Sequence, residues 1–377
     1  MCGDGHIYNV RMALVNRGRS DKGEKMKRLI IAFIMAVFTT TAYAETFTYI
    51  VPAGPDGGNA KWAQRVVKEW NKYLGNDKVV IRYMPGDPKK TFAKFNNELS
   101  KDGKTMIQSR GMIKYITSGD GWGGFNPKDY ATIIAQHQGT FVFAKKDIPE
   151  LPAIHIGGGS ETIVDAMSIA MMLCGPMCFD KLVECSKSNM RQVKGWKGSG
   201  DRRKAFLNGE IDVTRDGFSH MIKTYKGGIK SGKTQVWYTH GVSLNGTIKP
   251  DPAMPEKWFN TIYKEKWGQV PSGRYYNAYA IILKTRSGLG KTVFLSKDSP
   301  HTDVLIKSFD TMLKNKASKK QLDKKLGKYP WALGKDANDS KMAIFGAINS
   351  KELLNDVKTS REVFGEKVTI KWSTFFN

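Results

Sequence analysis

The sequence has few of the residues on which most catalytic and metal sites depend. Of 377 residues, four are cysteine and six are histidine. The histidines are scattered along the chain, and no Ser/His/Asp or Cys/His arrangement with a recognisable motif is present. We therefore expect a protein that is not an enzyme, without a cofactor.

Apolar runs of membrane-spanning length are also missing. The run Leu29 to Phe38 is too short to cross a bilayer; it follows Met26-Lys27-Arg28 and precedes Ala42-Tyr43-Ala44. A basic segment, a short apolar segment and an A-x-A cleavage site are the three parts of a secretory signal peptide. We expect residues 26–44 to be this signal peptide and residues 1–25 to be an upstream extension without a structural role. The mature protein would then begin at Glu45 and be periplasmic.

Cysteine is scarce in the mature chain. Cys2 would leave with the leader, so Cys174, Cys178 and Cys185 remain. An odd number allows one disulfide and one free thiol. Three thiolates so close in sequence could also ligate a metal, but neither their spacing nor a nearby histidine fits a zinc pattern. We favour buried, inert cysteines on a helix, and no metal.

Acidic residues are few relative to basic ones. The chain has 60 Lys/Arg against 35 Asp/Glu, a net charge of +25. Residues 1–44 hold seven Lys/Arg and three Asp/Glu, a net +4, so the mature chain keeps +21. This charge favours acidic partners or small anions. The lysines are not gathered in one block, so nucleic acid is not expected; a basic protein that binds an extended polyanion stays an alternative.

One stretch near the start of the mature chain combines a strand, a glycine turn and a helix. Thr48 to Asn59 is an apolar run that breaks into a Gly/Pro turn, and Trp62, Val66 and Trp70 then recur at helical spacing. We expect Asn59 to be the N-cap of this helix. Such an arrangement lets an anion rest on backbone N–H groups at the positive end of a helix dipole; the alternative is a tight strand-to-helix connection without a ligand.

Strands and helices alternate through the rest of the chain, which argues for parallel sheets with crossover helices. The strand Ala153 to Ile156 leads into a second glycine loop, Gly157 to Ser160, and another helix follows. We expect the strand Tyr279 to Lys284 to return the chain to the first lobe. The predicted fold is α/β with two lobes, each a mixed sheet flanked by helices, and a ligand cleft between them. Lobe 1 would comprise residues 45–143 and 282–377, and lobe 2 residues 144–281.

A phosphate-loop pattern, G-x-x-x-x-G-K-[ST], occurs at Gly227 to Thr234. Its mechanism needs a strand before the loop and a helix after it. Here a helical segment, Met221 to Tyr225, precedes the loop and a β-rich run, Gln235 to Thr239, follows it. Nucleotide binding is therefore the least favoured function.

Six short motifs occur in an order typical of one family. They are Ile50-Val51-Pro52 with Gly54, Gly57 and Gly58; Val79-Val80 with Pro85-Gly86; Asp102 to Met106; Asn126 to Ile133; Gly157 to Ser160; and Trp196 to Gly200 with Gly209 to Asp212. Together they resemble the periplasmic solute-binding proteins of tripartite tricarboxylate transporters, also called the Bug receptors. The segment after the crossing strand, Asp147 to Pro152, is shorter than the family's helix there, and the loop Gly119 to Gly124 is unusually rich in glycine.

The resemblance implies a two-lobed, type II periplasmic-binding-protein fold that holds a small carboxylate at two glycine loops and delivers it to membrane transporter subunits. The protein would then be a monomer that binds a di- or tricarboxylate or an acidic amino acid. Arg110 could clamp a second carboxylate, and Asp216 could orient a water or a ligand hydroxyl; a solvated arginine and a capping aspartate are the alternatives. The expected ligand-binding residues are Ala53, Gly54, Gly57, Gly58, Asn59, Ser109, Arg110, Gly158, Gly159, Ser160 and Asp216.

Overall fold

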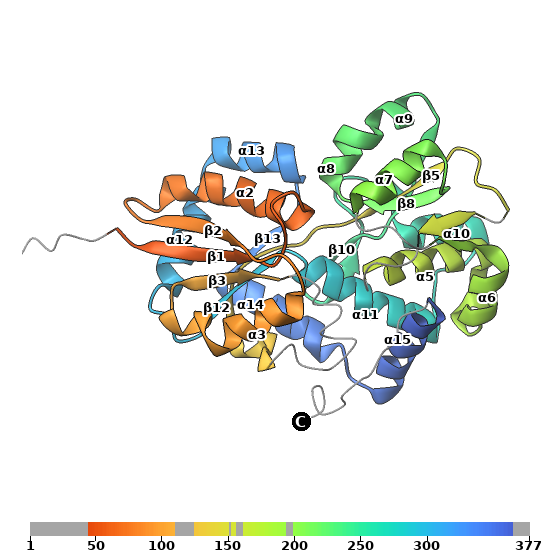
Figure 1. Cartoon of the computed structure of the whole chain (residues 1–377). Helices are drawn as coiled ribbons and strands as arrows, with labels where there is room; N and C mark the ends of the chain where they lie inside the picture. The colour runs from red at the N-terminus through yellow and green to blue at the C-terminus, as the bar shows by residue number, and fades with distance from the viewer. Residues whose placement is uncertain (1–43, 110–123, 151, 156–160, 194–198, 365–377) are drawn as a thin grey trace, which may run out of the picture. The chain divides into compact units, whose positions relative to one another are not determined.

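The computed structural model describes residues 44–109, 124–150, 152–155, 161–193 and 199–364 (Figure 1). By its contacts the chain divides into the units Met1–Ala44 and Glu45–Asn377. The expected extension and signal peptide therefore lie outside the described residues, except for Ala44. The described part of the second unit contains two mixed sheets flanked by helices, as the sequence predicts. None of the described helices combines the length and the apolar character that crossing a bilayer requires.

A six-stranded sheet is built from both ends of this unit. Its order is β13-β4-β12-β3-β1-β2. The strands are β1 Thr46–Val51, β2 Lys78–Tyr83, β3 Thr105–Gln108, β4 Tyr130–Gln136, β12 Thr292–Ser296 and β13 Trp331–Leu333. β1 is parallel to β2 and β3, whereas β12 runs antiparallel to β3 and β4. The last residues of β1, β3 and β4 and the first residues of β12 therefore lie at one end of the sheet, called here the carboxyl end.

Helices cover both faces of this sheet (Figure 1). On one face, α2 (Gly58–Trp70), α12 (Thr302–Lys314) and α13 (Lys316–Leu326) share a core with the side chains of Tyr49 and Met106. On the other face, α3 (Pro88–Asn97), α14 (Gly334–Gly346) and α15 (Lys351–Val363) pack on Ile50 and Ile107. Tyr49 and Ile50 thus pack into different cores, because successive side chains of a strand point to opposite faces and both faces of this sheet are covered.

The apolar stripe predicted for α2 is confirmed. Trp62, Val66 and Trp70 are buried. Trp70 meets the ring of Phe309 edge-on with ring centroids 5.1 Å apart, and its Nε1 donates to Ser308 Oγ at 2.8 Å. The large indole thus gains apolar contact while its one polar group stays satisfied, as a buried tryptophan requires.

A five-stranded sheet, in the order β7-β6-β8-β5-β9, follows in sequence. Its strands are β5 Phe141–Lys145, β6 Ala153–His155, β7 Arg191–Val193, β8 Val213–Asp216 and β9 Thr234–Thr239. β6 is parallel to β7 and β8, and β5 is antiparallel to β8 and β9. The segments between and after these strands form α5 Glu161–Cys174, the 3₁₀ turn η5 Gly175–Phe179, α6 Leu182–Asn189, α7 Ser199–Asn208, α8 Phe218–His220, the π-helical turn Met221–Tyr225, α9 Lys226–Lys230, the hairpin of β10 Val242–Leu244 and β11 Thr247–Lys249, and α10 Phe259–Trp267.

The expectation of a returning strand at Tyr279 to Lys284 is wrong. These residues lie in the helix α11, Arg274–Leu289, and the chain re-enters the six-stranded sheet through β12. Nearly the whole circumference of α11 is buried, because it contacts α5, α14, α15 and β10. A helix buried on all sides shows no polar face, and its apolar run cannot be told from a buried strand by periodicity.

Two glycines allow close packing where the chain passes between the two sheets. Gly139 lies between β4 and β5, and a Cβ there would overlap the carboxylate of Asp251. Gly241 follows β9 with φ +85°, and a Cβ there would overlap the Lys249 carbonyl oxygen and lie 2.9 Å from Trp258 Nε1. Both positions exclude a side chain, and Gly241 also needs a left-handed backbone.

Gly241→Ala should therefore be strongly destabilising. We expect a loss of about 2–5 kcal/mol, the sum of about 1–2 for left-handed strain and about 1–3 for overpacking. The matched control is Gly232→Ala, because Gly232 has φ +71° but nothing within 4 Å of its Cβ position. Urea unfolding followed by circular dichroism measures both variants, and equal losses would show that the close approach at Gly241 carries no energy.

Candidate functional site

The N-terminus of α2 carries no side-chain cap. Gly57 is the N-cap, with φ −69° and ψ 157°, and no acidic residue lies in the first turn. The preceding turn closes through a hydrogen bond from Gly57 N to Gly54 O at 3.2 Å. The first N–H groups of a helix have no intrahelical acceptor, and their partial positive charge favours an anion. Cβ positions on Gly54 and Gly58 would meet nothing within 4 Å, so there is open space beside both glycines.

The expectation that Asn59 caps this helix is wrong. Asn59 lies inside the first turn of α2, and its Oδ1 accepts a hydrogen bond from Lys291 Nζ. The extended backbone at Gly57 starts the helix two residues earlier than the Asn side chain suggested. Lys291 directly precedes β12, so this contact places a lysine at the carboxyl end of the sheet, beside the start of α2.

Ser109 and Gln108 end β3 at the same place, with opposite roles. Ser109 is fully buried; its hydroxyl donates to Leu289 O and accepts from Thr292 N at 3.0 Å. Gln108 is also fully buried, but neither atom of its side-chain amide has a hydrogen-bond partner among the described residues. Side chains alternate along a strand, so Gln108 lies on the same face as Met106, which is the face that α2 covers. Sequence reasoning selected Ser109, whose hydroxyl is already used by the fold, and missed Gln108.

A second glutamine, Gln136, is the last residue of β4 and lies at the same end of the sheet. Gln136 Oε1 accepts from Trp62 Nε1 and from Gln138 Nε2, each at 2.7 Å. The carboxyl end of the six-stranded sheet thus presents amide groups, a lysine and a helix N-terminus, with Ala53 buried beneath the glycine turn. These groups are suited to hydrogen-bonding a carboxylate rather than to acid–base chemistry.

Asp216 ends β8 in the five-stranded sheet, at the strand end where the sequence placed it. Its carboxylate, nearly buried, lies 3.1 Å from Arg203 Nη1 and 3.1 Å from His220 Nδ1, and it accepts from the hydroxyl of Tyr225 at 3.4 Å. Burial raises the pKa of this carboxyl, but the hydrogen bond with His220 and the charges of Arg202 and Arg203 outweigh it, so the pKa is lowered to about 2. Asp216 is therefore ionised at neutral pH.

A second buried carboxylate, Asp165, lies one turn into α5. It contacts His240 Nε2 at 2.9 Å, Arg286 Nη1 at 3.1 Å and Arg215 Nε at 2.6 Å. Burial raises its pKa, yet the two guanidinium groups and His240 lower it well below the usual range. Burial lowers the pKa of His240, which is held neutral between Asp165 and the hydroxyl of Tyr279.

Four arginines surround these two aspartates in the described structure. Arg202 donates to Arg215 O at 2.7 Å, and its Nε is buried without a hydrogen-bond partner. Arg202, Arg203, Arg215 and Arg286 thus place four positive charges beside the two carboxylates. Buried charge is stabilised by opposite charge, so these arginines and aspartates form one cluster. Its members are far apart in sequence, and no motif could have joined them.

Four of the expected ligand-binding residues cannot be placed. Arg110, Gly158, Gly159 and Ser160 lie outside the described residues, as does Gly157. The helix that follows this loop, α5, begins at Glu161. The roles expected for these residues therefore stay predictions.

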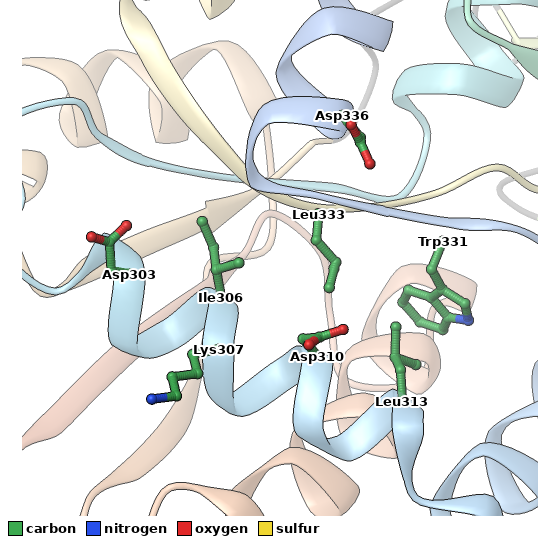
Figure 2. Close-up of a pocket in the computed structure, with 8 residues that line it drawn as sticks. All are labelled: Asp303, Ile306, Lys307, Asp310, Leu313, Trp331, Leu333 and Asp336. Atoms are coloured by element: carbon green, nitrogen blue, oxygen red, sulfur yellow. The ribbon is translucent and has the colours of Figure 1, made fainter.

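Two surface hollows are lined by residues other than the expected ligand-binding residues. Figure 2 shows the first, of about 470 Å³, where Asp303 and Asp310 of α12 and Asp336 of α14 flank apolar side chains and Trp331. Its carboxylates disfavour an anion. The second, of about 480 Å³, is lined by Lys145, Lys146, Asp147 and the turn Ser231 to Lys233. This turn belongs to the phosphate-loop pattern, and α9 precedes it while β9 follows, so the strand–loop–helix order of a nucleotide site is not met.

The three cysteines are the one grouping of potential metal ligands found among the described residues. The expectation that they lie on one helix is wrong. Cys174 ends α5, Cys178 lies in η5 and Cys185 lies in α6. Cys185 lies close enough to Cys174 and to Cys178 to form a disulfide with either one, but not with both. Three sulfur ligands without a histidine or carboxylate do not complete a structural zinc site.

The lowered pKa of Asp216 makes part of the stability dependent on pH. The ordinary value is 3.8 and the folded value about 2, so the unfolded state binds the proton more tightly. The stabilisation, about 2 kcal/mol, is present above pH 4 and lost as pH falls through about 2. We expect Asp216→Asn to be less stable than the wild type at pH 6 and to approach it at pH 2. Urea unfolding across this range tests the idea, which parallel stability curves would refute.

Comparisons with known proteins are consistent with this architecture. No family model matches the chain, and no curated protein matches it. Among solved structures, R. palustris Rpa4515 with adipate is 13% identical and has a TM-score of 0.52, over 86% of this chain and 98% of that one. The periplasmic binding protein BugD is 15% identical, with a TM-score of 0.49, over 86% of this chain and 99% of that one. MatC from Rhodopseudomonas palustris with bound malate is 14% identical, with a TM-score of 0.47, over 85% of this chain and 99% of that one.

At such identities only the fold can be compared, and only a TM-score above 0.5 carries weight in that comparison. The similarity to Rpa4515 meets this condition over most of both chains. Two mixed sheets flanked by helices, in one compact unit from Glu45, agree with it. The chain thus shares the fold of Rpa4515 over most of both chains, and its two mixed sheets flanked by helices are the α/β fold class that the sequence predicts.

Proposed function

We propose that this chain is an exported solute-binding protein of the Bug type that captures a small organic anion and delivers it to a membrane transporter. The anion would be a di- or tricarboxylate or an acidic amino acid, bound without catalysis in the periplasm. The observation that carries the proposal is the N-terminus of α2 without a side-chain cap, at the same end of the six-stranded sheet as the buried amide of Gln108, which has no partner among the described residues.

The first step of the argument concerns the helix N-terminus. A glycine N-cap gives the first-turn N–H groups no side-chain acceptor, and Gly54 and Gly58 add no side chain to the turn. A carboxylate can therefore accept from two or more N–H groups at once. Lys291, held beside Asn59, adds positive charge at the same place.

The second step concerns Gln108. A buried amide without partners costs about 1–3 kcal/mol, so its retention needs a compensating role. A ligand at the carboxyl end of the sheet would supply an acceptor for Nε2 and, through a hydroxyl or an amino group, a donor for Oε1. This supports an oxygen-rich ligand with more than one polar group.

The third step concerns the other sheet. The second glycine loop, Gly157 to Ser160, is proposed as the facing part of the site, with closure following from a ligand that contacts both parts. The neighbour Rpa4515 was solved with adipate, a compound of this class.

A thermal-shift screen of the protein against di- and tricarboxylates and acidic amino acids tests the proposal, together with Gly57→Asp. A ligand at 100 times its Kd should stabilise the wild type by about 2.7 kcal/mol. Asp at the N-cap would bond the first-turn N–H groups itself, so the free variant should be as stable as the wild type or slightly more so, yet lose binding. Gly57→Ala is the control without a charge. The proposal fails if no organic anion stabilises the wild type, or if Gly57→Asp binds unchanged.

Gln108→Met separates a ligand contact from a structural defect. Met has a similar volume and no polar atoms, so the ligand-free variant should gain about 1 kcal/mol of stability. The same change should weaken binding of the ligand found in the screen by about tenfold, because its partner amide is gone. Calorimetric titration and urea unfolding measure the two effects. Met106→Leu, on the same strand and face, should leave the affinity unchanged; a Gln108→Met variant with wild-type affinity would remove Gln108 from the site.

A further inference from the structure

The cysteine cluster joins three successive elements beside the five-stranded sheet. Cys174 is the last residue of α5, Cys178 lies in η5 and Cys185 lies in α6. The three sulfur atoms lie within 4.8 Å of one another. The Cα atoms are 6.1 Å apart for Cys174 and Cys185, and 5.6 Å apart for Cys178 and Cys185. Both separations lie in the range that a disulfide spans without backbone movement.

Cys185 is therefore a partner that two other cysteines share. Cys178 Sγ and Cys185 Sγ both lie near Ala170 O, at 3.2 Å and 3.3 Å, and Cys174 Sγ lies 3.6 Å from Cys185 O. One sulfur forms one disulfide bond, so one pair excludes the other and leaves one thiol. The sequence separations are 11 and 7 residues. Loop-closure entropy varies only with the logarithm of loop size, so it favours neither pair strongly.

The three thiols differ in access. Cys178 and Cys185 have no exposed surface, whereas Cys174 is partly exposed. A small disulfide in solution therefore meets Cys174 first. Thiol–disulfide exchange requires a thiolate to reach a sulfur atom, so access decides which cysteine reacts.

We propose that this cluster is a thiol–disulfide exchange site with Cys174 as its entry residue and Cys185 as the shared partner. The oxidant is a low-molecular-weight disulfide, RSSR. The Cys174 thiolate attacks RSSR and forms a mixed disulfide, and RS⁻ leaves. The Cys185 thiolate then attacks the Cys174 sulfur, forms Cys174–Cys185 and expels the second RS⁻.

Cys178 carries out the last step of this exchange reaction. The Cys178 thiolate attacks the Cys185 sulfur, forms the buried Cys178–Cys185 bond and releases the Cys174 thiolate. Two protein thiols are thereby oxidised to one disulfide, RSSR is reduced to two RSH, and the last exchange is redox-neutral. The released Cys174 thiol is again accessible, so it is also a site of S-thiolation by a second RSSR. This role is independent of the ligand proposed above.

A map of the disulfide linkages among the three cysteines tests whether Cys185 pairs with both Cys174 and Cys178. The full chain with Cys2→Ser is treated with glutathione disulfide, quenched with acid and alkylated. Cleavage at Met177 by cyanogen bromide and at Lys181 by trypsin separates all three cysteines, so mass spectrometry can identify each pair. We expect one disulfide per chain, with both Cys174–Cys185 and Cys178–Cys185 present. Three free thiols, or a single linkage in every sample, would overturn the proposal.

Two variants test the entry residue. Cys174→Ser keeps the buried pair Cys178 and Cys185, whereas Cys178→Ser keeps the accessible Cys174 with Cys185 and serves as the matched control. We expect glutathione disulfide to oxidise Cys174→Ser at least about tenfold more slowly than Cys178→Ser, because only the latter has an accessible thiolate. Circular dichroism confirms that both are folded before oxidation. Equal rates would exclude Cys174 as the entry thiol.

Discussion

The ion pairs and hydrogen bonds of the buried Asp165 carboxylate are the interactions on which much of the structure depends. Through Arg215, His240 and Arg286 the carboxylate joins α5 to the end of β8, the end of β9 and α11. Ion pairs at such depth cost desolvation energy that their attraction only partly returns, and removing one partner leaves the other charge buried and unbalanced. The four elements are therefore fixed relative to one another by a set of charges that must stay together.

The two sheets carry different kinds of polar group. The carboxyl end of the six-stranded sheet offers neutral amides and a helix N-terminus, with one lysine beside them. The cluster at the five-stranded sheet offers full guanidinium charges around two carboxylates. Neutral donors orient an oxygen without a large desolvation cost, whereas guanidinium groups hold carboxylates through charge-assisted hydrogen bonds. The first set is suited to hydrogen bonding, and the second joins elements of the fold through ion pairs.

The sequence predicted the parts of the fold that local pattern determines. The strand, glycine turn and helix from Thr46 to Trp70 are correct because the stripe of Trp62, Val66 and Trp70 and the glycines are close in sequence. The helix α11 was taken for a strand because its burial on all sides removed the polar face that marks a helix.

The candidate site was less predictable than the fold. Gly57 replaced Asn59 as the cap because the backbone conformation of the turn, not a side chain, sets the helix start. Ser109 and Gln108 are neighbours of similar polarity, and only three-dimensional contacts distinguish the satisfied hydroxyl from the unsatisfied amide. The contacts of Asp165 with Arg215, His240 and Arg286 join distant parts of the sequence, so only the folded chain reveals them.

The open N-terminus of α2 has a practical consequence for handling the protein. Backbone N–H groups select for negative charge and size but hardly for chemical identity, so, at the site proposed above, acetate, citrate, phosphate and sulfate in a buffer would compete for the same donors. Apparent affinity and melting temperature would then depend on the buffer salt as well as on the solute under study. The choice of counterion belongs to the definition of the unliganded reference state.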